Sequence, residues 1–164
     1  MKFRRIEAVF MKQIKDTLKN KTALIQFVLF PLLAFILTET IAKSDKFLPD
    51  NYFVLLFAIM YVGMVPAINT ASIITEEKEK NTLRILMLAN VRPLEYLIGV
   101  GSYVFIVSSI GAVAFGFIGG YSGAQLGLFI IVLMVGILGS LILGSTIGIF
   151  AKNSMSSAGL VLPV

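Results

Sequence analysis

The sequence predicts an all-α bundle of helices that crosses a membrane several times. Hydrophobic residues make up 57% of the 164 positions and charged residues only 14%, whereas a soluble domain carries about 25% charged residues. The apolar residues gather in runs of about 20, the length that a helix needs to cross a bilayer. Basic residues stand at the ends of these runs. Together these observations favour a polytopic membrane protein over an exceptionally apolar soluble core.

The first segment, residues 1–21, is charged and amphipathic. Its large apolar side chains recur every three or four residues, which is the spacing of one helix face, while most of its lysines fall on other faces. This pattern predicts a helix that lies in the headgroup layer on the cytoplasmic side of the membrane. The alternative is an amphipathic helix packed on a partner. The apolar face consists of Phe3, Ile6, Phe10, Ile14 and Leu18.

The rest of the chain, residues 22–164, is predicted to be one transmembrane domain with at least four spans. Its first apolar run is too long for a signal peptide, whose apolar part covers about 7–15 residues. The run is therefore expected to stay as a helix, which Pro31 should kink or loosen. The predicted spans cover residues 22–42, about 52–75, about 94–119 and about 126–151.

The second half of the second span is unusually polar for a helix that faces lipid. Such side chains need partners inside a bundle or in a water-filled cavity. The residues concerned are Pro66, Asn69, Thr70, Ser72 and Thr75.

A fresh apolar run begins at Ala158 and reaches Val164 without a stop signal. An apolar segment that begins and does not cross the bilayer would be an odd natural terminus. Further residues are therefore expected after Val164.

The distribution of positive charge predicts the orientation. Of the 14 Lys and Arg residues, twelve lie on one side of the predicted membrane. Seven are in the N-terminal segment, four are in the loop between the second and third spans, and the twelfth is Lys152. The opposite side holds Lys43 and Lys46. Because cytoplasmic loops carry the excess of positive charge, the N-terminus is expected in the cytoplasm. The chain is expected to cross the cell membrane of a bacterium in multiple passes.

The residue inventory argues against an enzyme. The chain has neither cysteine nor histidine, which removes thiolate nucleophiles, cysteine-bound zinc and the commonest general base. No Gly-Lys pair is present, so a phosphate-binding loop is missing. We therefore predict no catalytic residue, no metal site and no cofactor. The net charge of +5 lies at the ends of the spans, which indicates a lipid bilayer and not a nucleic acid as the partner.

Two carboxylates lie in or beside the predicted spans. Glu95 stands at the mouth of the third span, and Glu39 lies within about one turn of the outer end of the first. A carboxylate inside the membrane can mark a proton or substrate path. The position of Glu39 favours the alternative, an interfacial side chain that reaches the headgroups.

Small residues recur every four positions along two spans, and such stripes let helix backbones approach closely. One interpretation is a contact between two chains or a face along which helices slide. The simpler interpretation is ordinary helix packing within one chain. The stripe of the third span is Ser108, Ala112, Gly116 and Gly120. The stripe of the fourth span is Gly136, Ser140, Gly144 and Gly148.

The loop between the second and third spans is predicted to hold a short amphipathic helix at about residues 76–90. Its acidic cluster comes first, where the macrodipole of a helix favours negative charge. An apolar patch of Leu83, Leu86 and Met87 follows at helical spacing. A helix with an apolar patch surrounded by charged residues suits a groove on another protein. The alternative is a solvated loop helix without a partner.

Residues 73–86, IITEEKEKNTLRIL, resemble the E-K-E-x-G-T-L-x-x-L signature of permease subunits of type-2 ATP-binding-cassette exporters. Residues 92–99, RPLEYLIG, are similar to the P-x-x-x-x-x-G-K entry into the third span of that family. Asn81 stands where the family often has glycine, and Val100 follows Gly99 where the family has lysine.

The resemblance implies a six-span permease whose loop helix is a coupling helix, seated in a groove of a separate ATPase subunit that binds ATP and magnesium. A second permease half, identical or related, would complete the pathway. The residues themselves leave open an ATP-independent secondary transporter or channel subunit, or a membrane scaffold. The contact residues implied for the ATPase subunit are Glu76, Glu77, Glu79, Thr82, Leu83, Leu86 and Met87.

Overall fold

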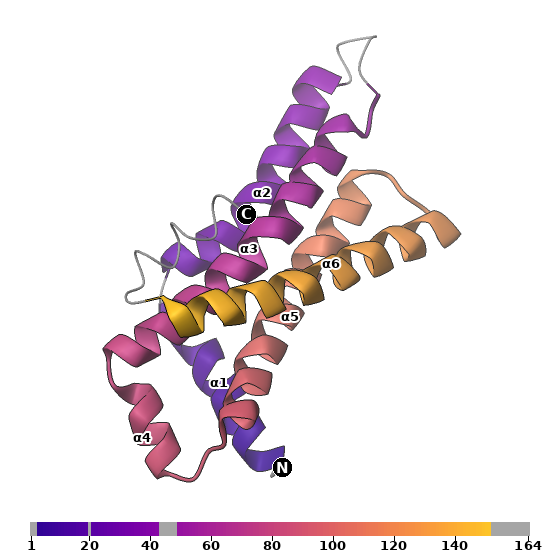
Figure 1. Ribbon diagram of the computed structural model, residues 1–164. Coiled ribbons are helices and arrows are strands. Elements are labelled where there is room, and N and C mark those ends of the chain that lie inside the picture. The colour runs from indigo at the N-terminus through magenta and orange to yellow at the C-terminus, as the bar shows by residue number, and fades with distance from the viewer. Residues whose placement is uncertain (1–2, 20, 43–48, 152–164) are drawn as a thin grey trace.

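The computed structural model describes residues 3–19, 21–42 and 49–151, and every regular element in these ranges is a helix (Figure 1). The all-α prediction is confirmed. The elements are α1 (Phe3–Lys19), α2 (Lys21–Leu37), a π-helical turn η1 (Thr38–Ala42), α3 (Tyr52–Glu79), α4 (Thr82–Leu88), α5 (Pro93–Ile118) and α6 (Gly123–Phe150).

Four stretches of the described chain are long and apolar enough to cross a membrane: Ile25–Ala42, Tyr52–Glu79, Pro93–Ile118 and Gly123–Phe150. They match the four predicted spans within about one turn, so the polytopic membrane fold is confirmed. The exposed side chains along α6 are mostly large and apolar, as expected of a surface that faces lipid. The predicted outer-loop charges Lys43 and Lys46, together with Lys152 and the run at 158–164, lie outside the described residues.

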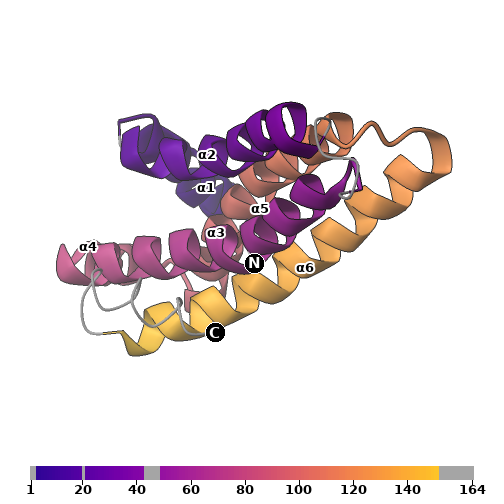
Figure 2. The same ribbon diagram turned by 90° about the horizontal axis from the view of Figure 1, so that it is seen from above.

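The two central helices are α3 and α5, with α2 on one side and α6 on the other (Figure 2). Tyr61 of α3 lies at the centre, where its ring contacts those of Phe30 and Phe115 edge-on. The helices α2 and α3 run on through Pro31 and Pro66.

The polar half of α3 faces the bundle, as its sequence predicts. Asn69, Thr70 and Thr75 are buried. The side-chain amide of Asn69 donates to Gln26 Oε1 of α2 over 3.2 Å and to the carbonyl of Val65 over 2.9 Å. The side chain of Asn69 therefore finds its partners within the chain.

The small-residue stripe of the fourth span packs on α3. A Cβ added at Gly144 would lie 2.5 Å from the carbonyl oxygen of Ala67, and one added at Gly148 would lie 3.0 Å from the Cα of Ala71. Ser140 donates a hydrogen bond to the carbonyl of Val62 over 2.5 Å. We call this contact the α3–α6 seam. The contacts of the stripe thus lie within one chain.

The stripe of the third span differs from its prediction at one end. Ser108, Ala112 and Gly116 are buried on α5. Gly120 lies beyond the helix in the turn to α6, with φ of 66°. Glycine adopts this left-handed conformation readily. The turn, and not helix packing, therefore explains why position 120 is a glycine.

Candidate functional site

Several elements lie near one end of the bundle (Figure 1). They are α1, the last turns of α3 and α6, the short helix α4 and the first turn of α5. This end contains the charged motif that the sequence singles out. We call it the α4 end.

The acidic cluster belongs to α3 and not to the loop helix. Glu76, Glu77 and Glu79 form its last turn, so the prediction that they open the helix at 76–90 is wrong. The reason is length: 28 residues rise about 42 Å, more than the hydrocarbon core of about 30 Å, so α3 projects beyond it. The macrodipole disfavours acidic side chains at this end of a helix, which makes their basic partners important.

A break at Asn81 separates α3 from α4. The amide of Lys80 closes the last turn of α3 by donating to the carbonyl of Glu76 over 3.0 Å. Asn81 then adopts φ of 56°, in the left-handed region. Glycine and asparagine are the residues that enter this region most readily. This accounts for asparagine at the position where the resemblance expects glycine.

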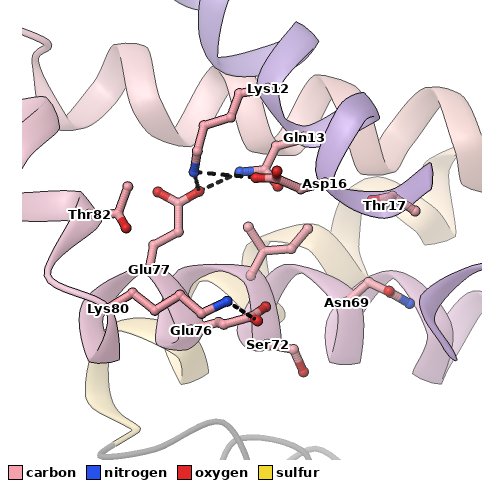
Figure 3. A pocket seen from close by; sticks show the side chains of 11 residues that line it. Lys12, Gln13, Asp16, Thr17, Asn69, Ser72, Glu76, Glu77, Lys80 and Thr82 are labelled. Carbon is pink, nitrogen blue, oxygen red and sulfur yellow. Dashed lines mark hydrogen bonds and ion pairs between the residues drawn. The ribbon is translucent and has the colours of Figure 1, made fainter. Parts of the chain in front are cut away.

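Glu77 lies inside the protein, with 6% of its surface exposed. Its Oε1 accepts hydrogen bonds from Lys12 Nζ over 2.6 Å and from Gln13 Nε2 over 2.5 Å, both on α1 (Figure 3). A buried carboxylate needs such partners because burial of an unpaired charge is costly. Glu77 therefore binds α1 within the chain. The prediction that it lies on a surface for the ATPase subunit is corrected.

The neighbouring Glu76 is solvated and forms an ion pair with Lys80 four residues later, over 2.6 Å. The hydrogen bond and the charge of Glu76 raise the pKa of the Lys80 amine above its usual value. Exposed pairs of this kind contribute little to stability. The third charged residue of the turn, Lys78, donates to carbonyl oxygens at the end of α6.

A polar cavity of about 560 Å³ lies between α1 and α3, beside the start of α4 (Figure 3). Lys12 reaches across it to Glu77, while Lys80 and Glu76 line its α3 side. The lining is completed by Gln13, Asp16, Thr17, Asn69, Ser72, Ile73 and Thr82. In the described part of the chain, no group of three acidic side chains is placed to hold a metal ion.

The apolar patch of α4 is turned differently from the prediction. Leu83 and Leu86 are half-buried and pack against the core of the chain, and Met87 is half-buried as well. Ile85 and Leu88 are the exposed apolar residues, at 63% and 77%. Because α4 reads TLRILML, apolar residues occur on two of its faces. Packing against the rest of the chain determines which face of α4 contacts the core. The spacing of apolar residues in the sequence does not distinguish the two faces.

The mouth of the third span holds a second buried carboxylate. Glu95 is 1% exposed and lies 3.5 Å from the guanidinium of Arg5 on α1. Its Oε2 also accepts the backbone amide of Arg92 over 3.2 Å, which caps the start of α5. The partner of Glu95 was not predicted. Arg5, Val9, Gln13 and Thr17 recur every four residues on α1, and that spacing is the signal of the inward face.

The helix α1 is held mainly by α5. A Cβ added at Gly99 of α5 would lie 2.8 Å from the Cβ of Val9, so the two backbones approach closely. Phe10 of α1 meets Tyr103 of α5 edge-on with ring centroids 6.2 Å apart. Together with the Arg5–Glu95 pair, these contacts attach α1 along the first turns of α5.

The described chain is a membrane protein in which the long helix α3 leads through a charged motif into the short helix α4. The family model described as ABC-2 type transporter matches residues 4–164, so the chain belongs to this family. It is a transmembrane permease of an ATP-binding-cassette transporter, the component distinct from the ATPase. Comparisons with curated proteins and with solved structures give no match.

Proposed function

We propose that this permease is the membrane subunit of an exporter, which moves substrate out of the cytoplasm with ATP hydrolysed by a separate ATPase subunit. ATP and magnesium would bind to that subunit. The observation that carries the proposal is the exposed apolar face of α4, formed by Ile85 and Leu88. Each such side chain gains about 1.5–3 kcal/mol when fully buried. A face of this kind on a short helix suits a groove of another protein.

Short connections on both sides of α4 would transmit a displacement of this helix to the neighbouring spans. The helix α3 ends at Glu79 and α4 begins at Thr82; α4 ends at Leu88 and α5 begins at Pro93. On its other side, α4 is packed on the core through Leu83 and Leu86. A displacement of α4 by the ATPase subunit would therefore reach α3 and α5 directly and would not be absorbed by a long loop.

In this proposal the α4 end and the N-terminus lie on the cytoplasmic side of a bacterial cell membrane. The α4 end carries basic residues on α1, on the last turn of α3 and around α4, whereas the described residues at the opposite end, 49–52 and 118–123, include no Lys or Arg. This difference fits the positive-inside rule. The exposed apolar residues Phe3, Met11 and Leu18 share one face of α1, as expected of a helix in the headgroup layer.

A second permease half, either an identical or a related chain, would stand beside this one in the bilayer. Large apolar side chains cover the outward face of α6. This face suits either lipid or another permease, since both present apolar surface inside a membrane.

Charge placed on the exposed face of α4 tests the proposal. Leu88→Asp should weaken co-purification of a co-expressed ATPase subunit more than about ten-fold, because a buried unpaired charge costs several kcal/mol. Transport should fall with it, while the spans stay inserted. Tyr52→Asp is the matched control, since Tyr52 is also exposed but lies at the opposite end. It should bind the ATPase subunit normally.

Normal binding and transport in Leu88→Asp would contradict the assignment of α4. Transport by the purified chain without any ATPase subunit would favour an ATP-independent secondary transporter or channel subunit. Absence of transport in every combination would favour a membrane scaffold.

A further inference from the structure

Lys78 is the residue of the charged turn whose role the proposed function does not explain. Its Nζ lies 2.7 Å from the carbonyl oxygen of Ile149, 2.9 Å from that of Ala151 and 3.3 Å from that of Gly148. All three acceptors belong to the end of α6, about 70 residues further along the chain. The side chain therefore joins the end of α3 to the end of α6.

The chemistry of this contact is specific. The last carbonyl groups of a helix have no partner within the helix. Within the described residues, the bond from the amide of Ala151 to the carbonyl of Ile147 closes the final turn of α6. An ammonium group has three donors and no acceptor, so Lys78 can satisfy three carbonyls at once. Its positive charge also suits the negative end of the helix macrodipole.

The contact extends the α3–α6 seam to the α4 end. Gly144 and Gly148 hold the two backbones together below it, and Lys78 closes the seam at the last turn of both helices. By contrast, α1 reaches α3 across the polar cavity through side chains of Lys12 and Gln13. The end of α3 is thus attached along its backbone to α6 and only through side chains to α1.

We propose that Lys78 is a positioning residue that fixes the end of α3 to the end of α6, so that α4, α3 and α6 move as one body. Displacement of α4 would then move the fourth span as well as the second. The transport consequence rests on the proposed function, whereas the attachment itself does not.

Two spin labels measure the attachment directly. The chain has no native cysteine, so cysteines at Ile85 and Phe150, both well exposed, can be labelled selectively. In the detergent-purified permease alone, we expect one narrow distance distribution. Lys78→Met keeps an unbranched side chain only one atom shorter but removes all three donors, and it should broaden and shift that distribution. Lys78→Arg keeps donors and charge and should restore the narrow distribution.

Glu77→Gln is the control for general loosening, because it weakens the contact of α3 with α1 and leaves Lys78 in place. It should leave the label distance unchanged. With the ATPase subunit present, Lys78→Met should lower the transport achieved per ATP hydrolysed about five-fold or more. If Lys78→Met fails to accumulate, Lys78→Leu, which also has no donor, takes its place with the same expected result.

An unchanged distribution in the donor-free variant would overturn the proposal, as would equal broadening in Glu77→Gln. Because the distances are measured without the ATPase subunit, a failure of the exporter assignment would affect the transport measurement alone. The two failures are therefore distinguishable.

Discussion

The end of α3 contacts two neighbours in opposite ways. Towards α6 it forms the α3–α6 seam, in which glycines bring the backbones together, as at Gly148 against Ala71. Towards α1 it faces a polar cavity that is crossed by the side chains bound to Glu77. Backbone packing of the first kind is rigid, whereas long side chains across a cavity can rearrange. The comparison indicates that α3 moves together with α6 and can shift relative to α1.

The largest expected effect comes from breaking the α3–α6 seam. Gly144→Leu would force a side chain against the carbonyl oxygen of Ala67, so we expect a loss of about 3 kcal/mol or more in stability. Gly139→Leu is the matched control, since Gly139 lies on the same helix and a Cβ added there would meet no other atom within 4 Å. Thermal unfolding and the monodisperse fraction in detergent measure the difference. Equal stability of the two variants would contradict tight packing at the seam.

A smaller effect is expected on the α1 side. Glu77→Gln should cost about 1–3 kcal/mol, because the buried oxygen loses charge-assisted bonds from Lys12 and Gln13. Glu76→Gln, one residue earlier, should cost about 0–1 kcal/mol because its pair with Lys80 is exposed. Thermal unfolding in high and low salt compares them. Equal losses in the two variants would show that Glu77 is not the buried contact.

The smallest effect concerns the joint between α3 and α4. Asn81→Ala should destabilise the permease by about 1 kcal/mol, because a left-handed backbone disfavours residues with an ordinary Cβ. Asn81→Gly fits the same backbone and should unfold close to the parent temperature. A stabilised alanine variant would mean that the joint is helical, and that α3 and α4 form one rod.

The apolar runs and the charges at their ends were sufficient to predict the spans. Their boundaries hold within about one turn because bilayer thickness limits helix length. The contacts of the individual residues in the charged turn could not be predicted from the sequence, since Glu76, Glu77 and Lys78 are adjacent in it. Each successive residue is rotated by about 100° around the helix. Which neighbour each one meets depends on where α1 and α6 lie, and a local pattern does not contain that information.

The short helix α4 shows the same limit. A helix of seven residues with five apolar ones has no single apolar face. The prediction from helical spacing placed Leu83, and not Ile85, on the surface for a partner. Packing of the chain on its own core decides that Leu83 is turned inward and Ile85 outward.

Protection of α4 by the ATPase subunit tests the central claim most directly. Single cysteines at Leu88, exposed on α4, and at Tyr52, exposed at the opposite end, would be labelled with a soluble thiol reagent in the purified permease. We expect addition of the ATPase subunit to slow labelling at position 88 more than about ten-fold and to leave labelling at position 52 unchanged. Unchanged labelling at position 88 in a complex that demonstrably contains the ATPase subunit would contradict the assignment of α4 as its docking site.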